Sequence, residues 1–125
     1  MRHPHRAATG DCVTRGEIYT AVAREASSGK PQQVLIVQDD RFDATASVTV
    51  CPFTTSEVDA PLIRIPIEPS DTNGLSRPSS LMVDKITTVP RSGLGERLGR
   101  LRDDELVQLN RSMMVFLGLA SATQP

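Results

Sequence analysis

The segment PQQVLIVQDD (residues 31–40) carries the clearest structural signal in the chain, because an unbroken apolar run lies between polar ends. Val34–Val37 has the length and composition of a strand that is buried on both faces. Asp39 and Asp40 follow at once, and aspartates favour turns. The segment therefore predicts an internal strand of a sheet, ending at the aspartate pair.

Segments on both sides of residues 31–40 also have the pattern of strands. They are Arg15–Val22, Ser47–Phe53, Leu62–Ile67, Ser80–Val83 and Ile86–Val89. Pro66 in Leu62–Ile67 confines that strand to an edge or a strand end. Ala23–Pro31 is nine residues long, more than a tight hairpin needs, and suggests a moving or binding element.

After Pro90 the apolar residues follow a helical period. Asp103 or Asp104 can cap a helix at its N-terminus, and Gly118 stands where a C-terminal glycine is preferred. The apolar stripe of this helix comprises Leu106, Leu109, Met113, Phe116 and Leu117. Strands first and a helix last predict an α+β fold, a small, mostly antiparallel, SH3-like β-barrel with a C-terminal α-helix.

Composition fits one domain, which we place at residues 15–120, with a flexible N-terminal tail at 1–14 and a flexible C-terminal end at 121–125. Fourteen Lys and Arg against fifteen Asp and Glu leave a net charge of -1, so a polyanion must be held by a local patch. Aromatic residues make up only 3% of the chain, so the core is small and aliphatic. A small core suggests help from a partner subunit.

Two cysteines, Cys12 and Cys51, are too few for a secreted disulfide framework. The basic N-terminus lacks the apolar core of a signal peptide, and no apolar run approaches the roughly 18 residues that span a bilayer. These observations predict a cytoplasmic protein without membrane contact. His3 and His5 lack a third ligand, so we predict no metal site and no cofactor.

Nucleotide-binding and metalloprotease motifs are absent, and no histidine follows His5. Polar residues instead gather at strand ends, with Thr54 and Thr55 after one strand and Asp84 and Lys85 between two others. Hydroxyls and cations at adjacent strand ends can hold a phosphate. The alternative is that the threonines and the Asp39–Asp40 pair are only turn signals.

Several stretches occur in an order that resembles the MazF/PemK family of toxin–antitoxin ribonucleases. They are RGEIYTA from Arg15, VLIVQDD, VTVCPFTT ending at Thr55, LMVDKITTVP from Leu81, and LGERLGRL before a helix ending FLGL. The resemblance implies a homodimer that cleaves single-stranded RNA without metal, leaves a cyclic phosphate, and is blocked by a cognate antitoxin. It places the dimer interface around Phe53, Leu62 and the C-terminal region.

The resemblance also implies site residues, and one of them departs from the family. The family's catalytic threonine falls on Thr54, whereas its catalytic arginine falls on Gln32, a neutral amide that cannot reproduce a guanidinium fork. Lys30, two residues upstream, either supplies the missing charge or is a solvated loop lysine. The remaining RNA contacts that we predict are Arg24, Thr55, Asp84 and Lys85.

Two other functions remain open at this point. A DNA gyrase poison like CcdB has the same fold, but it relies on a C-terminal Trp-Gly ending, and Leu117 stands where the Trp is needed. A toxin fold that has lost catalysis and only binds its antitoxin or RNA is compatible with Gln32. Cleavage of mixed RNA, compared with gyrase supercoiling, separates these functions.

Overall fold

The computed structural model describes residues 12–22 and 31–121. The strands are β1 (Glu17–Ala21), β2 (Gln32–Ile36), β3 (Ser47–Thr54), β4 (Arg64–Ile67), β5 (Ser79–Met82), β6 (Thr87–Pro90) and β7 (Leu94–Arg100). Three short 3-10 helices, η1 (Asp40–Phe42), η2 (Val83–Lys85) and η3 (Arg91–Gly93), lie between strands, and α2 (Asp103–Phe116) comes last. Every predicted strand and the predicted helix are present, each within a few residues of the expected bounds.

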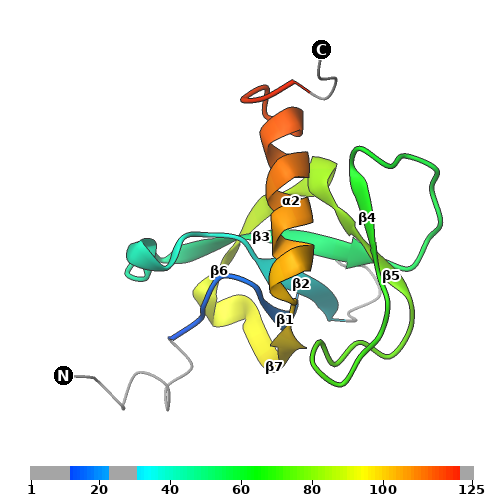
Figure 1. Ribbon diagram of the computed structural model, residues 1–125. Coiled ribbons are helices and arrows are strands. Elements are labelled where there is room, and N and C mark those ends of the chain that lie inside the picture. The colour runs from blue at the N-terminus through cyan, green and yellow to red at the C-terminus, as the bar shows by residue number, and fades with distance from the viewer. Residues whose placement is uncertain (1–11, 23–30, 122–125) are drawn as a thin grey trace.

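The strands form one antiparallel sheet in the order β4-β5-β3-β2-β1-β7. The long strand β3 connects its two parts, since β6 pairs with its first half and β5 with its last two residues. β4 lies at an edge of the sheet, as Pro66 predicted. The predicted α+β fold is confirmed, with α2 lying across the strands (Figure 1).

The sheet is barrel-like, but its hydrogen bonding does not close into a complete barrel, because β4 and β7 remain edge strands. The β4–β5 loop bridges part of this gap, where the Arg100 N–H donates to the Thr72 carbonyl over 3.0 Å. A Cβ atom at Gly99 would lie 2.2 Å from that same carbonyl oxygen. Only glycine fits this contact, so Gly99 is what allows the loop to approach β7.

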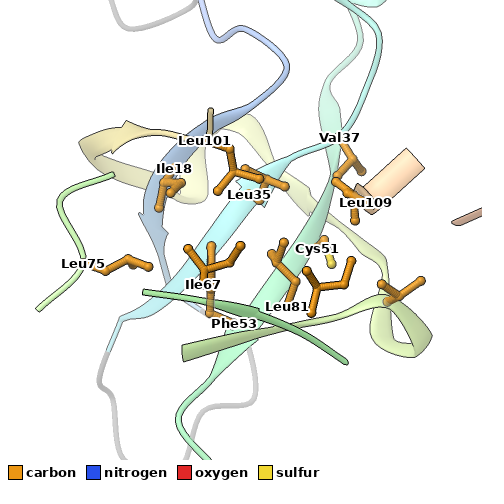
Figure 2. Close-up of a cluster of buried hydrophobic side chains, with 12 residues drawn as sticks. Ile18, Leu35, Val37, Cys51, Phe53, Ile67, Leu75, Leu81, Leu101 and Leu109 are labelled. Atoms are coloured by element: carbon orange, nitrogen blue, oxygen red, sulfur yellow. The ribbon is translucent and has the colours of Figure 1, made fainter. Parts of the chain in front are cut away.

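The core consists of two clusters of buried side chains on opposite faces of the sheet. The main cluster joins Ile18, Leu35, Phe53 and Leu81 to Leu109 of α2 (Figure 2). The second cluster lies on the other face and comprises Val13, Tyr19, Ala21, Val34, Ile36, Val48 and Val50. Alternate residues of β2 thus enter different clusters, which confirms that the apolar run is buried on both faces.

Helix α2 packs through Leu109, which is fully buried, and through the half-buried Leu106 and Met113. The other two residues of the predicted stripe, Phe116 and Leu117, are 46% and 58% exposed. They lie at the end of α2 that extends beyond the strands in Figure 1. The amphipathic pattern therefore predicted the helix correctly, but it overestimated how much of the helix the sheet covers.

Three further expectations need correction. Arg102, rather than an aspartate, precedes the helix, and its N–H donates to the Glu105 carboxylate over 2.9 Å. Val13, which was assigned to the tail, is buried in the second cluster. β7 was not predicted as a strand, because two glycines and three charged residues in Leu94–Arg100 hide the strand pattern.

Candidate functional site

The predicted site residues Gln32 and Thr54 meet at the end of the sheet where β2 begins and β3 ends. Val34 pairs with Pro52 in the antiparallel β2–β3 ladder. Gln32 lies two residues before Val34 and Thr54 two residues after Pro52, so the two side chains come opposite each other on the same face. The Gln32 Nε2–H donates to the Phe53 carbonyl over 2.9 Å. The fold therefore brings together the two residues that the family resemblance singled out.

This row of side chains continues across the next two strands. Thr54 pairs with Ser80 of β5, and Ser80 pairs with Pro66 of β4. Paired residues point to the same side of a sheet, and adjacent strands are about 4.8 Å apart. Gln32, Thr54, Ser80 and Pro66 therefore form one transverse line, which we call the strand-end row.

Thr54 is half-buried, and its Oγ1 accepts a hydrogen bond from the Ser56 N–H over 3.1 Å. This contact agrees with the interpretation of the threonines as a turn signal. It does not consume the hydroxyl proton, because a threonine hydroxyl accepts and donates at the same time. Thr54 can therefore shape the turn and still donate to a phosphate oxygen, while the exposed Thr55 follows in the same loop.

A groove of about 260 Å³ opens beside the strand-end row, and we call it the strand-end groove. Hydroxyl groups, two carboxylates and a few apolar side chains line it. The lining residues are Thr54, Thr55, Ser56, Glu57, Val58, Pro66, Glu68, Pro78, Ser79 and Ser80. None of these residues is a lysine or arginine, so the groove itself supplies no positive charge.

The two cations that the sequence predicts beside Gln32 and Thr54 belong to the β1–β2 connection. Arg24 and Lys30 belong to this segment, and both lie outside the described residues. Lys30 is two residues from Gln32 in the chain. The roles of Arg24 and Lys30 therefore stay predictions from the sequence.

The structure does not bring Asp84 and Lys85 to the strand-end row of the same chain. Both belong to η2, beyond the far end of β5, and Asp84 forms an ion pair with the mostly buried Arg64 of β4. Lys85 is exposed. Their predicted role in RNA binding therefore concerns a different surface from that of Gln32 and Thr54.

The predicted turn role of the aspartates after β2 is confirmed. Asp39 precedes η1, and its carboxylate accepts from the Arg41 N–H over 2.9 Å and from the Arg41 Nε–H over 3.0 Å. The Arg41 side-chain hydrogen bond, followed by the backbone one, lowers the pKa of Asp39 below its ordinary value. Asp39 therefore stays ionised at neutral pH and acts in the local turn.

The two cysteines are not bonded to each other. Cys12 is exposed, whereas Cys51 is fully buried and its Sγ contacts the Met82 carbonyl over 3.4 Å. Burial, with a smaller contribution from the nearby Asp84 carboxylate, raises the pKa of the Cys51 thiol to about 12. Cys51 is therefore a neutral core residue at neutral pH and not a nucleophile.

A second groove, of about 550 Å³, lies at the C-terminal end of α2 and differs in character. We call it the helix-end groove, and its lining is Leu62, Arg111, Ser112, Met114, Val115, Ala120 and Ser121. Phe116, Leu117 and Leu119 nearby are also exposed. A contiguous apolar patch of this kind is typical of a protein–protein contact.

Sequence reasoning predicted Thr54, Thr55 and Gln32 but missed Ser80, Glu57 and Glu68. Ser80 belongs to the site only because the strand register pairs it with Thr54, and this register cannot be predicted from the sequence. The predicted interface residue Phe53 proves to be 4% exposed and part of the main core cluster. Phe53 therefore cannot contact a partner, whereas Leu62, at 59% exposure, can.

Comparisons with known proteins agree with this architecture. Residues 14–117 match the family model described as PemK-like, MazF-like toxin of type II toxin-antitoxin system. The chain is 65% identical over 108 residues to the "Probable endoribonuclease MazF" of Mycolicibacterium smegmatis, covering 86% of this chain and 99% of that protein.

Solved structures of MazF toxins also resemble this chain. The Mycobacterium tuberculosis toxin MazF-mt6 superposes with a TM-score of 0.71 at 26% identity, over 83% of this chain and 98% of that one. A mycobacterial endoribonuclease in complex with its cognate antitoxin gives a TM-score of 0.69 at 25% identity, over 87% and 96% of the two chains. A MazE–MazF complex from Deinococcus radiodurans, at 17% identity and a TM-score of 0.68, has the same fold and covers 87% of this chain and 99% of its own.

Proposed function

The chain belongs to the PemK-like, MazF-like toxins of type II toxin–antitoxin systems, and from that premise we propose that it is an endoribonuclease. Its substrate is single-stranded RNA, in particular mRNA, so that cleavage inhibits translation and growth. The observation that carries the proposal is the strand-end row, in which Gln32 and Thr54 lie side by side next to a groove.

Cleavage proceeds by attack of a ribose 2′-oxygen on the adjacent phosphorus. The bond from phosphorus to the 5′-oxygen breaks, leaving a 2′,3′-cyclic phosphate on one fragment and a 5′-hydroxyl on the other. The proton lost by the 2′-hydroxyl balances the proton gained by the 5′-oxygen. No metal or other cofactor enters this scheme, so side chains have to position the phosphate and offset its growing charge.

Thr54 is the phosphate-binding group in this scheme, because its hydroxyl proton remains available. Gln32 stands at its side but is neutral, and one of its N–H groups is already given to the Phe53 carbonyl. Lys30 and Arg24 supply the charge, and Thr55 contacts the RNA backbone. A lysine is a point charge without the arginine fork, so we propose that this protein cleaves RNA slowly.

Of the two η2 residues predicted to contact RNA, Asp84 and Lys85, we propose that only Lys85 does so. Asp84 holds Arg64 in place, while Lys85 projects to solvent and contacts phosphate away from the row.

Two protein partners follow from the family and from the helix-end groove. We propose that a second copy of the chain covers this apolar surface around Leu62 and Met114, making the active form a homodimer. A cognate antitoxin then blocks the RNA-binding surface, as the mycobacterial relative solved with its antitoxin suggests. Among the described residues, no helix has the length and apolar character to cross a bilayer. We propose that the protein acts in the cytoplasm, where mRNA is found.

The test is incubation of the purified protein with mixed single-stranded RNA in the presence of a metal chelator. We expect fragments that end in a cyclic phosphate, and we expect a Thr54→Ala variant to produce none. Uncleaved RNA at high protein concentration would reject the proposed function. A gyrase supercoiling assay with the same preparation should remain unaffected, which separates the ribonuclease from a gyrase poison.

A further inference from the structure

The strand-end groove has a lining that the cleavage scheme does not explain. Thr54 and Ser80 belong to the strand-end row, but Glu57 and Glu68 bring two carboxylates to a surface that is meant to face RNA. Neither carboxylate forms an ion pair with another described residue. Carboxylates repel phosphate, so a different part of the RNA has to contact these two side chains.

Unpaired nucleobases are the part of RNA that fits this lining. An ionised carboxylate only accepts hydrogen bonds, and the exocyclic amino groups of adenine, cytosine and guanine only donate them. Uracil has no amino group, and its one base-pairing donor, N3–H, lies between the O2 and O4 acceptors, which the carboxylates repel. Single-stranded RNA is read mainly through such exposed base edges.

The rest of the groove also suits a flat, mostly apolar ring. Pro66, Pro78 and Val58 give it an apolar side, and Val58 is 53% exposed. Its volume of about 260 Å³ is slightly below the ~300 Å³ at which pockets for small ligands begin. This volume matches a single base better than a peptide segment.

The position of the groove ties it to the reaction. Thr54, which carries the phosphate-binding hydroxyl, itself lines the groove. Ser80 pairs with Thr54 about one strand spacing, some 5 Å, away, and Pro66 pairs with Ser80. A base belonging to a nucleotide next to the cleaved phosphate therefore reaches it.

We propose that the strand-end groove is a specificity pocket that accepts a base carrying an exocyclic amino group and rejects uracil, with Glu57 and Glu68 as the reading residues. This inference rests on the proposed ribonuclease function. Both residues act on substrate choice and not on the bond that breaks.

The experiment uses RNA oligonucleotides with one cleavable linkage, in which each flanking position carries A, C, G or U in turn. A set with a 2′-deoxy sugar at the cleaved position measures binding alone. For the protein as it stands, we expect one position at which uracil lowers both cleavage and binding roughly five- to hundredfold, the usual range for one base contact. A uracil at that position that binds and reacts as well as the other bases would overturn the pocket.

Conservative variants assign the pocket to its residues. Glu57→Gln or Glu68→Gln gives an amide that can donate to uracil, so we expect most of the discrimination against uracil at that position to be lost. Glu96→Gln, an exposed glutamate on β7 at the opposite edge of the sheet, is the matched control and should change nothing. Both groove glutamates are exposed, so folding is not at risk, and a thermal melt verifies this.

The two levels of the proposal fail separately. Unchanged base preference in both glutamine variants, with RNA still bound and cleaved, would overturn the specificity pocket and leave the ribonuclease standing. Failure to bind any of the oligonucleotides would overturn both.

Discussion

The two grooves of this small domain differ in nearly every physical respect. The strand-end groove is lined by hydroxyls and carboxylates and lies against a row of paired strand residues. The helix-end groove has about twice the volume and is lined by Leu62, Met114, Val115 and Ala120. Polar, precisely registered side chains suit a polar ligand, whereas a wide apolar surface suits a protein. One small domain can thus carry catalysis and assembly on separate surfaces.

The largest effect is expected at the strand-end row. Thr54→Ala removes the hydroxyl that we assign to the cleaved phosphate, and cleavage should fall by a factor of about 10² or more. Single-turnover cleavage of a defined oligonucleotide measures this loss. Thr88→Ala, at an exposed position of β6, is the matched control and should retain activity. Equal loss in both variants, or in neither, would remove Thr54 from the site.

Faster RNA cleavage is expected from a substitution at Gln32, on the strand next to Thr54. Gln32→Arg should raise cleavage at least about tenfold, because a guanidinium next to Thr54 stabilises the charge that develops on the phosphate. Lys30→Ala should then reduce activity more in the original protein than in this variant. Gln108→Arg, which adds the same charge on an exposed turn of α2, should have little effect. If the original protein already cleaves rapidly and Gln32→Arg changes nothing, the catalytic cation lies elsewhere.

Substitutions in the helix-end groove should weaken self-association of the chain. Met114→Glu or Leu62→Glu buries a charge in the proposed dimer contact, and we expect self-association to weaken roughly tenfold or more. Sedimentation at several protein concentrations measures this change. Phe42→Glu, at an equally exposed apolar residue on η1, should leave the dimer intact. A protein that is monomeric at micromolar concentration before any substitution would show that the helix-end groove serves another partner.

The smallest effect is expected at the cysteines, which line neither groove. At pH 8 a thiol reagent should modify the exposed Cys12 and leave Cys51 unmodified, since the buried thiol has a pKa of about 12 and stays neutral. Cleavage and self-association should change less than about twofold. Mass spectrometry before and after denaturation counts the modified thiols. Rapid modification of Cys51 in the native protein would mean that the core opens readily.

Local sequence patterns predicted most of the fold. The run Val34–Val37 and the alternation in Ser47–Phe53 predicted β2 and β3, and Pro66 predicted the edge position of β4. Gly118 was correctly predicted to end the helix, with a φ of +78° that glycine adopts without strain. β7 was missed because its residues are held by pairing with β1, more than 70 positions away, and not by their own preferences.

The sequence by itself determined the order of the elements, which depends on neighbours in the chain, and its resemblance to the family singled out Gln32 and Thr54. Only the tertiary structure decided that Ser80 and Pro66 extend the same row, that Glu57 and Glu68 enter its groove, and that Phe53 is internal. The physical reason is strand register. A shift of one residue in the pairing reverses which side chains face the core and which face the groove, and no single segment encodes that choice.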